Sequence, residues 1–105
     1  MTKVNTLEQA LHEALDDFAT DHTMWTKEAF ALDKGGFHVL SNDPTAVCWC
    51  TMGRAMLYLG VNHYRDIPGF PGNGDLYDAI TVANDASDDV ETLTRRVTDL
   101  MDASQ

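Results

Sequence analysis

The spacing of apolar residues near the N-terminus constrains the fold more than any other feature of this 105-residue chain. Between residues 6 and 19 they recur at the i, i+3, i+4, i+7 positions that share one face of an α-helix, and polar residues fill the opposite face. Asn5 is a suitable cap, and Glu8 follows three residues later, as in a capping box. We therefore expect a helix over 6–19. Its apolar face consists of Leu7, Ala10, Leu11, Ala14, Leu15 and Phe18.

A central helix is predicted over 44–60. Asp43 followed by Pro44 has the form of a helix start, because aspartate caps a helix and proline suits its first position. Gly60 is a natural stop. Apolar residues lie on almost every side of this segment, which is typical of a helix at the centre of a fold or of one that hides a face against a partner. A homodimer is therefore an open alternative.

Residues 24–40 allow two interpretations. Residues 25–32 suit a strand, and Gly35-Gly36 would permit a tight turn into a second strand over 37–40. Such a β-hairpin would lie as a small flap against the helices, since an isolated hairpin is only marginally stable. Residues 27–32 also suit a helical turn. The sequence does not decide between strand and helix here.

The C-terminal part of the chain predicts one loop and two more helices. Residues 61–74 are rich in Pro and Gly and predict a loop. A third helix is expected over 75–83, ended by the Asn84-Asp85 pair, and a last helix begins at Ser87 or Asp88. The last helix has one apolar stripe, formed by Val90, Leu93, Val97, Leu100 and Met101.

These elements predict a mainly α fold. About four helices would pack as a small orthogonal bundle, with the short β-hairpin as an open element between the first two helices, and residues 1–105 would form one compact domain. No stretch approaches the ~20 apolar residues that span a bilayer, and the N-terminal residues lack the apolar core of a signal peptide. We therefore expect a cytoplasmic protein, in the host cytoplasm if a phage encodes it, that contacts no membrane.

Negative charge is concentrated in one quarter of the chain. Residues 66–91 contain seven carboxylates and no Lys or Arg, and so supply −7 of the net charge of −10. Such a field repels nucleic acid and anionic membranes and attracts basic protein surfaces. We interpret this block as an acidic face that binds a basic partner. Its residues are Asp66, Asp75, Asp78, Asp85, Asp88, Asp89 and Glu91.

The sequence offers little for catalysis or metal binding. On a helix, Cys48 and Cys50 would point about 200° apart, so the two thiols would not share one metal ion. A zinc site needs about four ligands in recognisable pairs, and the four histidines stand alone. The glycine-rich stretch 69–74 lacks the Lys-Ser/Thr of a phosphate-binding loop. We therefore expect no catalytic residue, no metal and no cofactor.

Three short motifs, together with the closing amphipathic helix, resemble an uncharacterised family of small domains from bacteriophages and actinobacteria. The family pattern is an early Trp, a mid-chain Cys-x-x-Gly-Ala and a late Trp-Asn-Asp. Trp25, the pair Cys50 and Gly53, and Asn84-Asp85 match it. The resemblance covers most of the chain. It implies the fold and a phage-like origin, but no activity.

This chain departs from that pattern at two positions. Arg54 stands between Gly53 and Ala55, and Ala83 stands where the family has Trp. The resemblance implies structural roles for the matching residues: Gly53 would allow close helix packing, and Asn84-Asp85 would cap or brace a loop.

We therefore predict a non-catalytic acidic protein-binding module. One version is a phage or mobile-element inhibitor that imitates DNA, as some anti-CRISPR proteins do, and binds a basic nucleic-acid-binding protein without contacting nucleic acid itself. The alternatives are a structural or dimerising accessory protein, and a small enzyme. Besides the acidic block, candidate apolar contacts for a partner are Phe70, Trp25 and Trp49.

Overall fold

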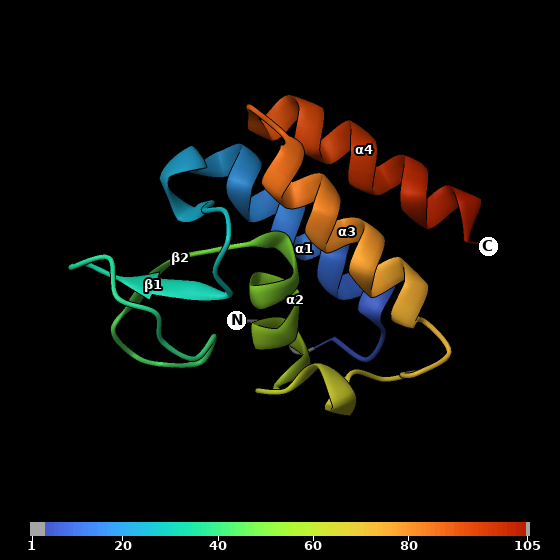
Figure 1. Cartoon of the computed structure of the whole chain (residues 1–105), viewed down its shortest axis with the longest axis horizontal. Helices are drawn as coiled ribbons and strands as arrows, with labels where there is room; N and C mark the ends of the chain where they lie inside the picture. The colour runs from blue at the N-terminus through green and yellow to red at the C-terminus, as the bar shows by residue number, and fades with distance from the viewer. Residues whose placement is uncertain (1–3, 105) are drawn as a thin grey trace.

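A computed structural model of the protein describes residues 4–104 (Figure 1). Within that range it has four α-helices, two short strands paired in one antiparallel sheet, and two 3-10 turns, which confirms a mainly helical fold. The helices are α1 Leu7–Thr20, α2 Thr51–Leu59, α3 Gly74–Ala86 and α4 Val90–Ala103. The strands are β1 Ala31–Asp33 and β2 Ala46–Trp49, and the 3-10 turns are η1 His22–Met24 and η2 Tyr64–Asp66.

The helices enclose one core, and the sheet lies to one side of it. In Figure 1, α3 and α4 lie side by side, α1 passes behind them, α2 occupies the centre, and β1 and β2 project to the opposite side. Within the part of the chain that the structure describes, no helix has both the length and the apolar composition of a membrane span. The largest fully buried core side chains are Leu11, Phe18, Met52, Met56, Ile80, Leu93, Val97 and Met101.

The first helix is confirmed, with its cap one residue later than expected. All six predicted apolar positions of α1 are buried. Thr6, not Asn5, is the N-cap, and its hydroxyl accepts a hydrogen bond from the Gln9 N–H at 3.2 Å. Gln9 Oε1 accepts a hydrogen bond from the Asn5 N–H at 3.4 Å, so the capping side chains are Thr6 and Gln9 instead of Asn5 and Glu8.

The prediction of one helix over 44–60 is wrong in its first third. Residues 46–49 form β2, and α2 begins only after Cys50. Asp43 does not cap a helix, because its Oδ1 accepts from the N–H and the hydroxyl of Thr45 at 2.8 and 2.6 Å in a local turn. A run that is apolar on every side suits a strand as well as a helix, and pairing with β1 decides between them.

The second part of that prediction is confirmed. Gly60 ends α2 in the left-handed conformation, with φ 73°. Seven of the nine residues of α2 are buried within the chain. Burial within the chain therefore explains why this segment is apolar on almost every side, and a homodimer is not needed to explain it.

The segment 25–40 is mostly irregular. Only Ala31–Asp33 is a strand, and its partner is β2, with Ala31 opposite Trp49. Residues 37–40 meet β1 in a single antiparallel bridge, from His38 to Leu32, with a backbone hydrogen bond on either side of it. The expected hairpin is therefore reduced to this short contact, without strands over 25–32 and 37–40. The expected turn is present, and Gly36 adopts a left-handed φ of 82° there.

The last two helices differ from the prediction at their ends. The loop over 61–74 is confirmed, with η2 inside it. Helix α3 continues past Asn84-Asp85 to Ala86, so this pair does not end it. Helix α4 is capped by Asp89, whose Oδ1 accepts from the Thr92 N–H at 2.7 Å, and not by Asp88 or Ser87.

Candidate functional site

Asn84 joins three separate segments of the chain. It is 1% exposed, and its Oδ1 accepts three hydrogen bonds, from Trp25 Nε1 at 2.8 Å and from the N–H and hydroxyl of Thr51 at 2.9 and 2.8 Å. Its Nδ2 donates to the Thr26 carbonyl at 3.0 Å. The end of α3, the start of α2 and the segment after η1 are thereby held together. We call these four residues the Asn84 junction.

Asp85 extends this junction to the next residues of the chain. Its Oδ1 accepts from the backbone N–H of Glu28 at 2.9 Å and from Asn84 Nδ2 at 3.2 Å. Glu28 adopts φ 62°, a conformation that residues other than glycine rarely take. The carboxylate therefore braces a strained turn, as the resemblance implied for this pair.

Cys50 and Gly53 lie at the start of α2. Cys50 is its N-cap, and its Sγ accepts from the Gly53 N–H at 3.2 Å. A Cβ on Gly53 would lie 2.0 Å from the Phe30 carbonyl oxygen, so only glycine lets the backbone before β1 pass so close to α2. The three motifs of the resemblance, far apart in sequence, therefore meet at one place.

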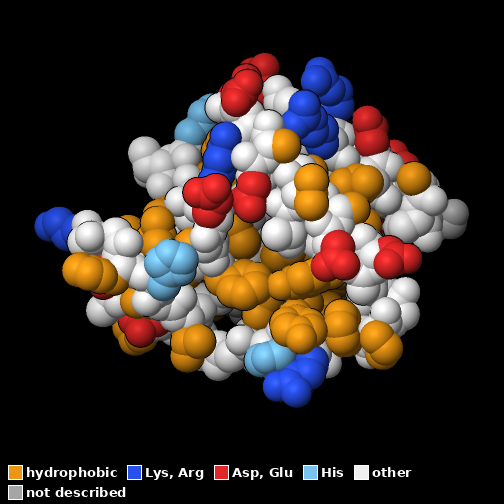
Figure 2. All heavy atoms as spheres, viewed as in Figure 1, with side chains coloured by type: hydrophobic (Ala, Val, Ile, Leu, Met, Phe, Trp, Pro, Cys, Tyr) orange, Lys and Arg blue, Asp and Glu red, His pale blue; other side chains and the backbone are white. Residues whose placement is uncertain are grey.

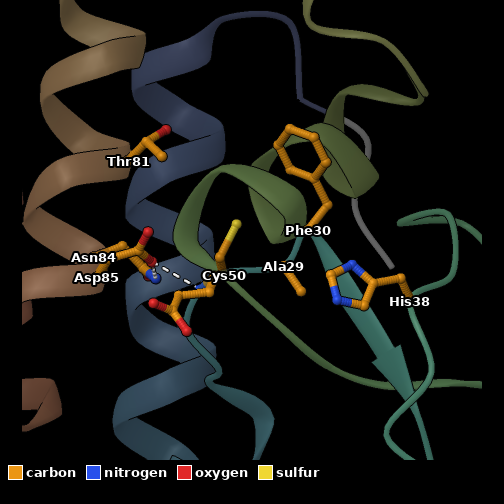
Figure 3. Close-up of a pocket in the computed structure, with 8 residues that line it drawn as sticks. Ala29, Phe30, His38, Cys50, Thr81, Asn84 and Asp85 are labelled. Atoms are coloured by element: carbon orange, nitrogen blue, oxygen red, sulfur yellow. Dashed lines mark hydrogen bonds between the residues drawn. The ribbon is translucent and has the colours of Figure 1, made fainter.

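A pocket of about 350 Å³ lies beside the Asn84 junction (Figure 3). Figure 3 shows Phe30 and His38 on one side of it, Thr81, Asn84 and Asp85 of α3 on the other, and Cys50 between them. Ala29 and Glu28 complete its lining.

The chemistry of this pocket is limited by burial. Cys50 is 6% exposed, and desolvation raises the pKa of its thiol to about 11, so the thiol is protonated at neutral pH and is a weak nucleophile. Both thiols are free, Cys48 half-buried in β2 and Cys50 at the helix start. The expectation that both thiols lie on one helix is wrong, because Cys48 lies in β2 and Cys50 caps α2. Among residues 4–104, no three His, Cys, Asp or Glu side chains are placed to hold a metal ion.

The seven carboxylates of the acidic block lie in different surroundings. Asp85 lines the pocket just described, while Glu91 lines a separate hollow together with His22 and Arg95. Asp89 caps α4, and the hydrogen bonds from Thr92 hold the pKa of that carboxyl below its usual value.

The block is therefore broken up on the surface. On the face drawn in Figure 2, acidic side chains form several groups, with Lys and Arg side chains and a wide apolar area between them. Asp66 lies in η2 directly after Arg65, and Asp88 is exposed in the turn before α4.

One part of the block remains together, on the outer side of α3. Asp75, Asp78 and Asp85 are all exposed, and since each helical residue turns by 100° they lie within about 80° of one another. Val82 lies between them on the same side and is 67% exposed. Helix α3 contains no Lys or Arg. The Asp85 carboxylate is held by its bonds to Glu28 and Asn84, so we call only Asp75, Asp78 and Val82 the outer side of α3.

The aromatic candidates are mostly interior. Trp49 is 8% exposed, its Nε1 donates to the Ser41 carbonyl at 2.9 Å, and the Arg54 guanidinium covers its ring at 4.4 Å. It belongs to the core, so the expectation of a partner contact there is wrong. Trp25 is half-buried and its N–H is taken by Asn84.

Phe70 is half-buried in the loop before α3. Its ring packs edge-on against Tyr64, with centroids 5.3 Å apart. It retains some accessible surface beside the 40% exposed Tyr64. The structure therefore leaves Phe70 as a candidate contact.

The sequence reasoning missed an open groove between α3 and α4. Its volume is about 830 Å³, and charged side chains at its edge are Asp78, Asp99 and Arg96. A signal for it was present, because residues 79, 82, 83 and 86 have the spacing of a second apolar stripe on α3. The apolar lining of this α3–α4 groove is Ala79, Val82, Ala83, Ala86, Leu100 and Ala103.

Comparison of the chain with protein-family models, with curated proteins and with solved structures found no match in any of the three.

Proposed function

We propose that this protein is a non-catalytic binding module that holds a basic segment of another protein. The observation that carries this proposal is the outer side of α3, where Asp75 and Asp78 are exposed on a helix without a single cation. A net charge of −10 adds long-range attraction, which speeds the encounter with a basic partner.

The arrangement of the charges favours a basic protein segment over imitation of nucleic acid as the mode of binding. A DNA mimic needs a long array of carboxylates at phosphate-like spacing. Here Arg95 and Glu91 line the same hollow, Arg96 and Asp78 line the same groove, and Asp89 is engaged as a helix cap. A nucleic-acid-handling host protein remains a suitable partner, bound through a basic segment by a phage-encoded inhibitor.

The non-catalytic part of the proposal is supported by the state of the pocket groups. Cys50 is protonated and already accepts a hydrogen bond from Gly53. The Asn84 side chain is occupied by its partners in the junction. These groups have little capacity left to activate or bind a reacting molecule.

The proposal is tested by affinity capture from a lysate of the native host at about 0.15 M salt, where only close charge pairs act. The test variant is Asp75→Asn with Asp78→Asn, and the matched control is Asp16→Asn with Asp66→Asn, which removes the same charge from other exposed positions. We expect the wild type and the control to capture the same basic proteins, and the test variant to fail to capture them. Equal capture by all three, or equal loss in both variants, would refute the proposal.

A further inference from the structure

Within residues 4–104, the α3–α4 groove is an open apolar surface. Val82, one of its lining residues, is 67% exposed, although an aliphatic side chain gains about 1.5–3 kcal/mol when it is fully buried. Figure 2 shows apolar side chains over the region of α3 and α4, with acidic groups on both sides of them. Apolar surface framed by charge is typical of a binding site for another protein.

The size and lining of the groove suit a helix. Four of its six apolar residues are alanines, Ala79, Ala83, Ala86 and Ala103, and small side chains let the backbone of another helix approach closely. Helices α3 and α4 lie side by side, so they offer a trough along their common direction (Figure 1). Helix α3 has 13 residues and is about 20 Å long, which matches an incoming helix of about 14 residues.

The charges at the edge decide which helix fits. Asp78 and Asp99 lie at the edge of the groove, and Asp75 continues the negative charge along α3. The one cation there, Arg96, lies near the Ser87 hydroxyl, 3.4 Å from its Nη1. A second copy of this chain, with its own net charge of −10 and the same acidic edge, would be repelled. A partner with basic residues is attracted.

We infer that the α3–α4 groove binds an amphipathic helix whose apolar stripe is flanked by Lys or Arg. The apolar stripe covers Val82 and Leu100, and the flanking cations lie against Asp78 and Asp99. This mode of recognition, a helix in a groove, uses anchors at i, i+3, i+4 and i+7. The inference rests on the proposed function, because it specifies the basic segment proposed there.

Two synthetic peptides of about 14 residues test the inference by fluorescence anisotropy with the full chain. Both carry the same number of Lys residues on a helix-forming sequence, and they differ only in an apolar stripe of Leu or of Gln. We expect the Leu peptide to bind at least about tenfold more tightly than the Gln peptide. Equal affinities for the two peptides would overturn the inference.

Matched variants of the protein locate the site. Val82→Gln is expected to weaken binding of the Leu peptide about five- to tenfold. The control, Phe37→Gln, removes a 71% exposed apolar side chain outside the groove and should leave the affinity unchanged. If Val82→Gln binds like the wild type, the groove is not the site.

The same assay separates the two proposals. If Asp75→Asn with Asp78→Asn weakens both peptides while Val82→Gln has no effect, the basic segment binds by charge alone and only the groove is refuted. If neither variant changes the affinity for either peptide, the proposed function is refuted as well.

Discussion

The two sides of α3 differ in how fully their side chains are used. On the inner side, Asn84 is 1% exposed, and its oxygen and nitrogen bind Trp25, Thr51 and Thr26. On the outer side, Val82 is 67% exposed, and acidic side chains lie around it. The inner side therefore holds three segments of the fold together, and we expect the outer side, Asp75, Asp78 and Val82, to tolerate substitution.

The largest effect should follow from Asn84→Ala. This change leaves the Trp25 N–H and two donors of Thr51 without their acceptor, in a place that water hardly reaches. Because buried donors without partners are costly, we expect a loss of about 3–5 kcal/mol in the free energy of unfolding, measured by urea denaturation. The exposed Asn62, changed to Ala, is the control and should cost less than about 0.5 kcal/mol.

A milder variant keeps this prediction testable if Asn84→Ala does not fold. Thr51→Val removes one of the three donors to Asn84 and should cost about 1 kcal/mol. A loss near zero in both variants would mean that the junction contributes no more to stability than an exposed position does.

Gly53→Ala should give the next largest effect. The new Cβ would lie 2.0 Å from the Phe30 carbonyl oxygen, and the clash involves backbone on both sides, so neither group can rotate away. We expect a loss of about 3 kcal/mol, with α2 displaced from the start of β1. Gly72→Ala is a control, since its Cβ would meet one backbone oxygen at 3.1 Å in an exposed loop. A variant of Gly53 as stable as the wild type would contradict the close approach.

Local pattern predicts the first and last helices because their periodicity is set by residues near in sequence. Six residues spaced along one face identify α1, and its boundaries are found within one residue. The Pro- and Gly-rich loop over 61–74 is recognised for the same reason.

Long-range contacts explain most of what the sequence did not predict. Residues 46–49 are apolar on all sides, and only their pairing with Ala31–Asp33 makes them a strand. Asparagine is a residue type often found at helix ends, so Asn84 was predicted to end a helix. Its hydrogen-bond partners lie 33 to 59 positions away in the chain, so nothing local marks it as buried. The α3–α4 groove was missed because alanine is a weak apolar signal on its own.

A second polar cluster lies between α1 and α2 and makes the stability of the fold depend on pH. Its residues are Asp17, Arg54 and Tyr58. Tyr58 donates its hydroxyl to Asp17 Oδ2 at 2.6 Å, and Arg54 Nε donates to the same oxygen at 2.8 Å. Burial, followed by the hydrogen bond to Asp17, raises the pKa of Tyr58 to about 12 from 10. The folded state therefore holds its phenol proton to higher pH than the unfolded state does, so this stabilisation is complete below pH 10 and is lost as the pH rises to about 12.

Tyr58→Phe should cost about 1–2 kcal/mol at neutral pH, since it removes a hydrogen bond to a carboxylate. The difference in unfolding free energy between wild type and this variant should shrink between pH 10 and about 12, measured by urea denaturation at several pH values. A difference that stays constant over this range would mean that folding does not raise the pKa of Tyr58.

The smallest effects are expected on the outer side of α3. Val82→Gln removes little buried surface, and glutamine is the better helix former, so the free energy of unfolding should change by less than about 0.5 kcal/mol. Asp78→Asn relieves repulsion from Asp75 three residues away, and we expect a change of the same small size. Both values come from the same urea denaturation as the Asn84 series.

A loss above about 1 kcal/mol in Val82→Gln would show that the outer side also supports the fold, because such a cost requires lost packing. The two sides of α3 would then no longer be separable, and weaker peptide binding by this variant would reflect damage to the helix instead of a lost contact. Unchanged stability together with weakened binding is the combination that assigns Val82 to recognition, since a side chain that contributes nothing to folding and something to affinity acts through the partner alone.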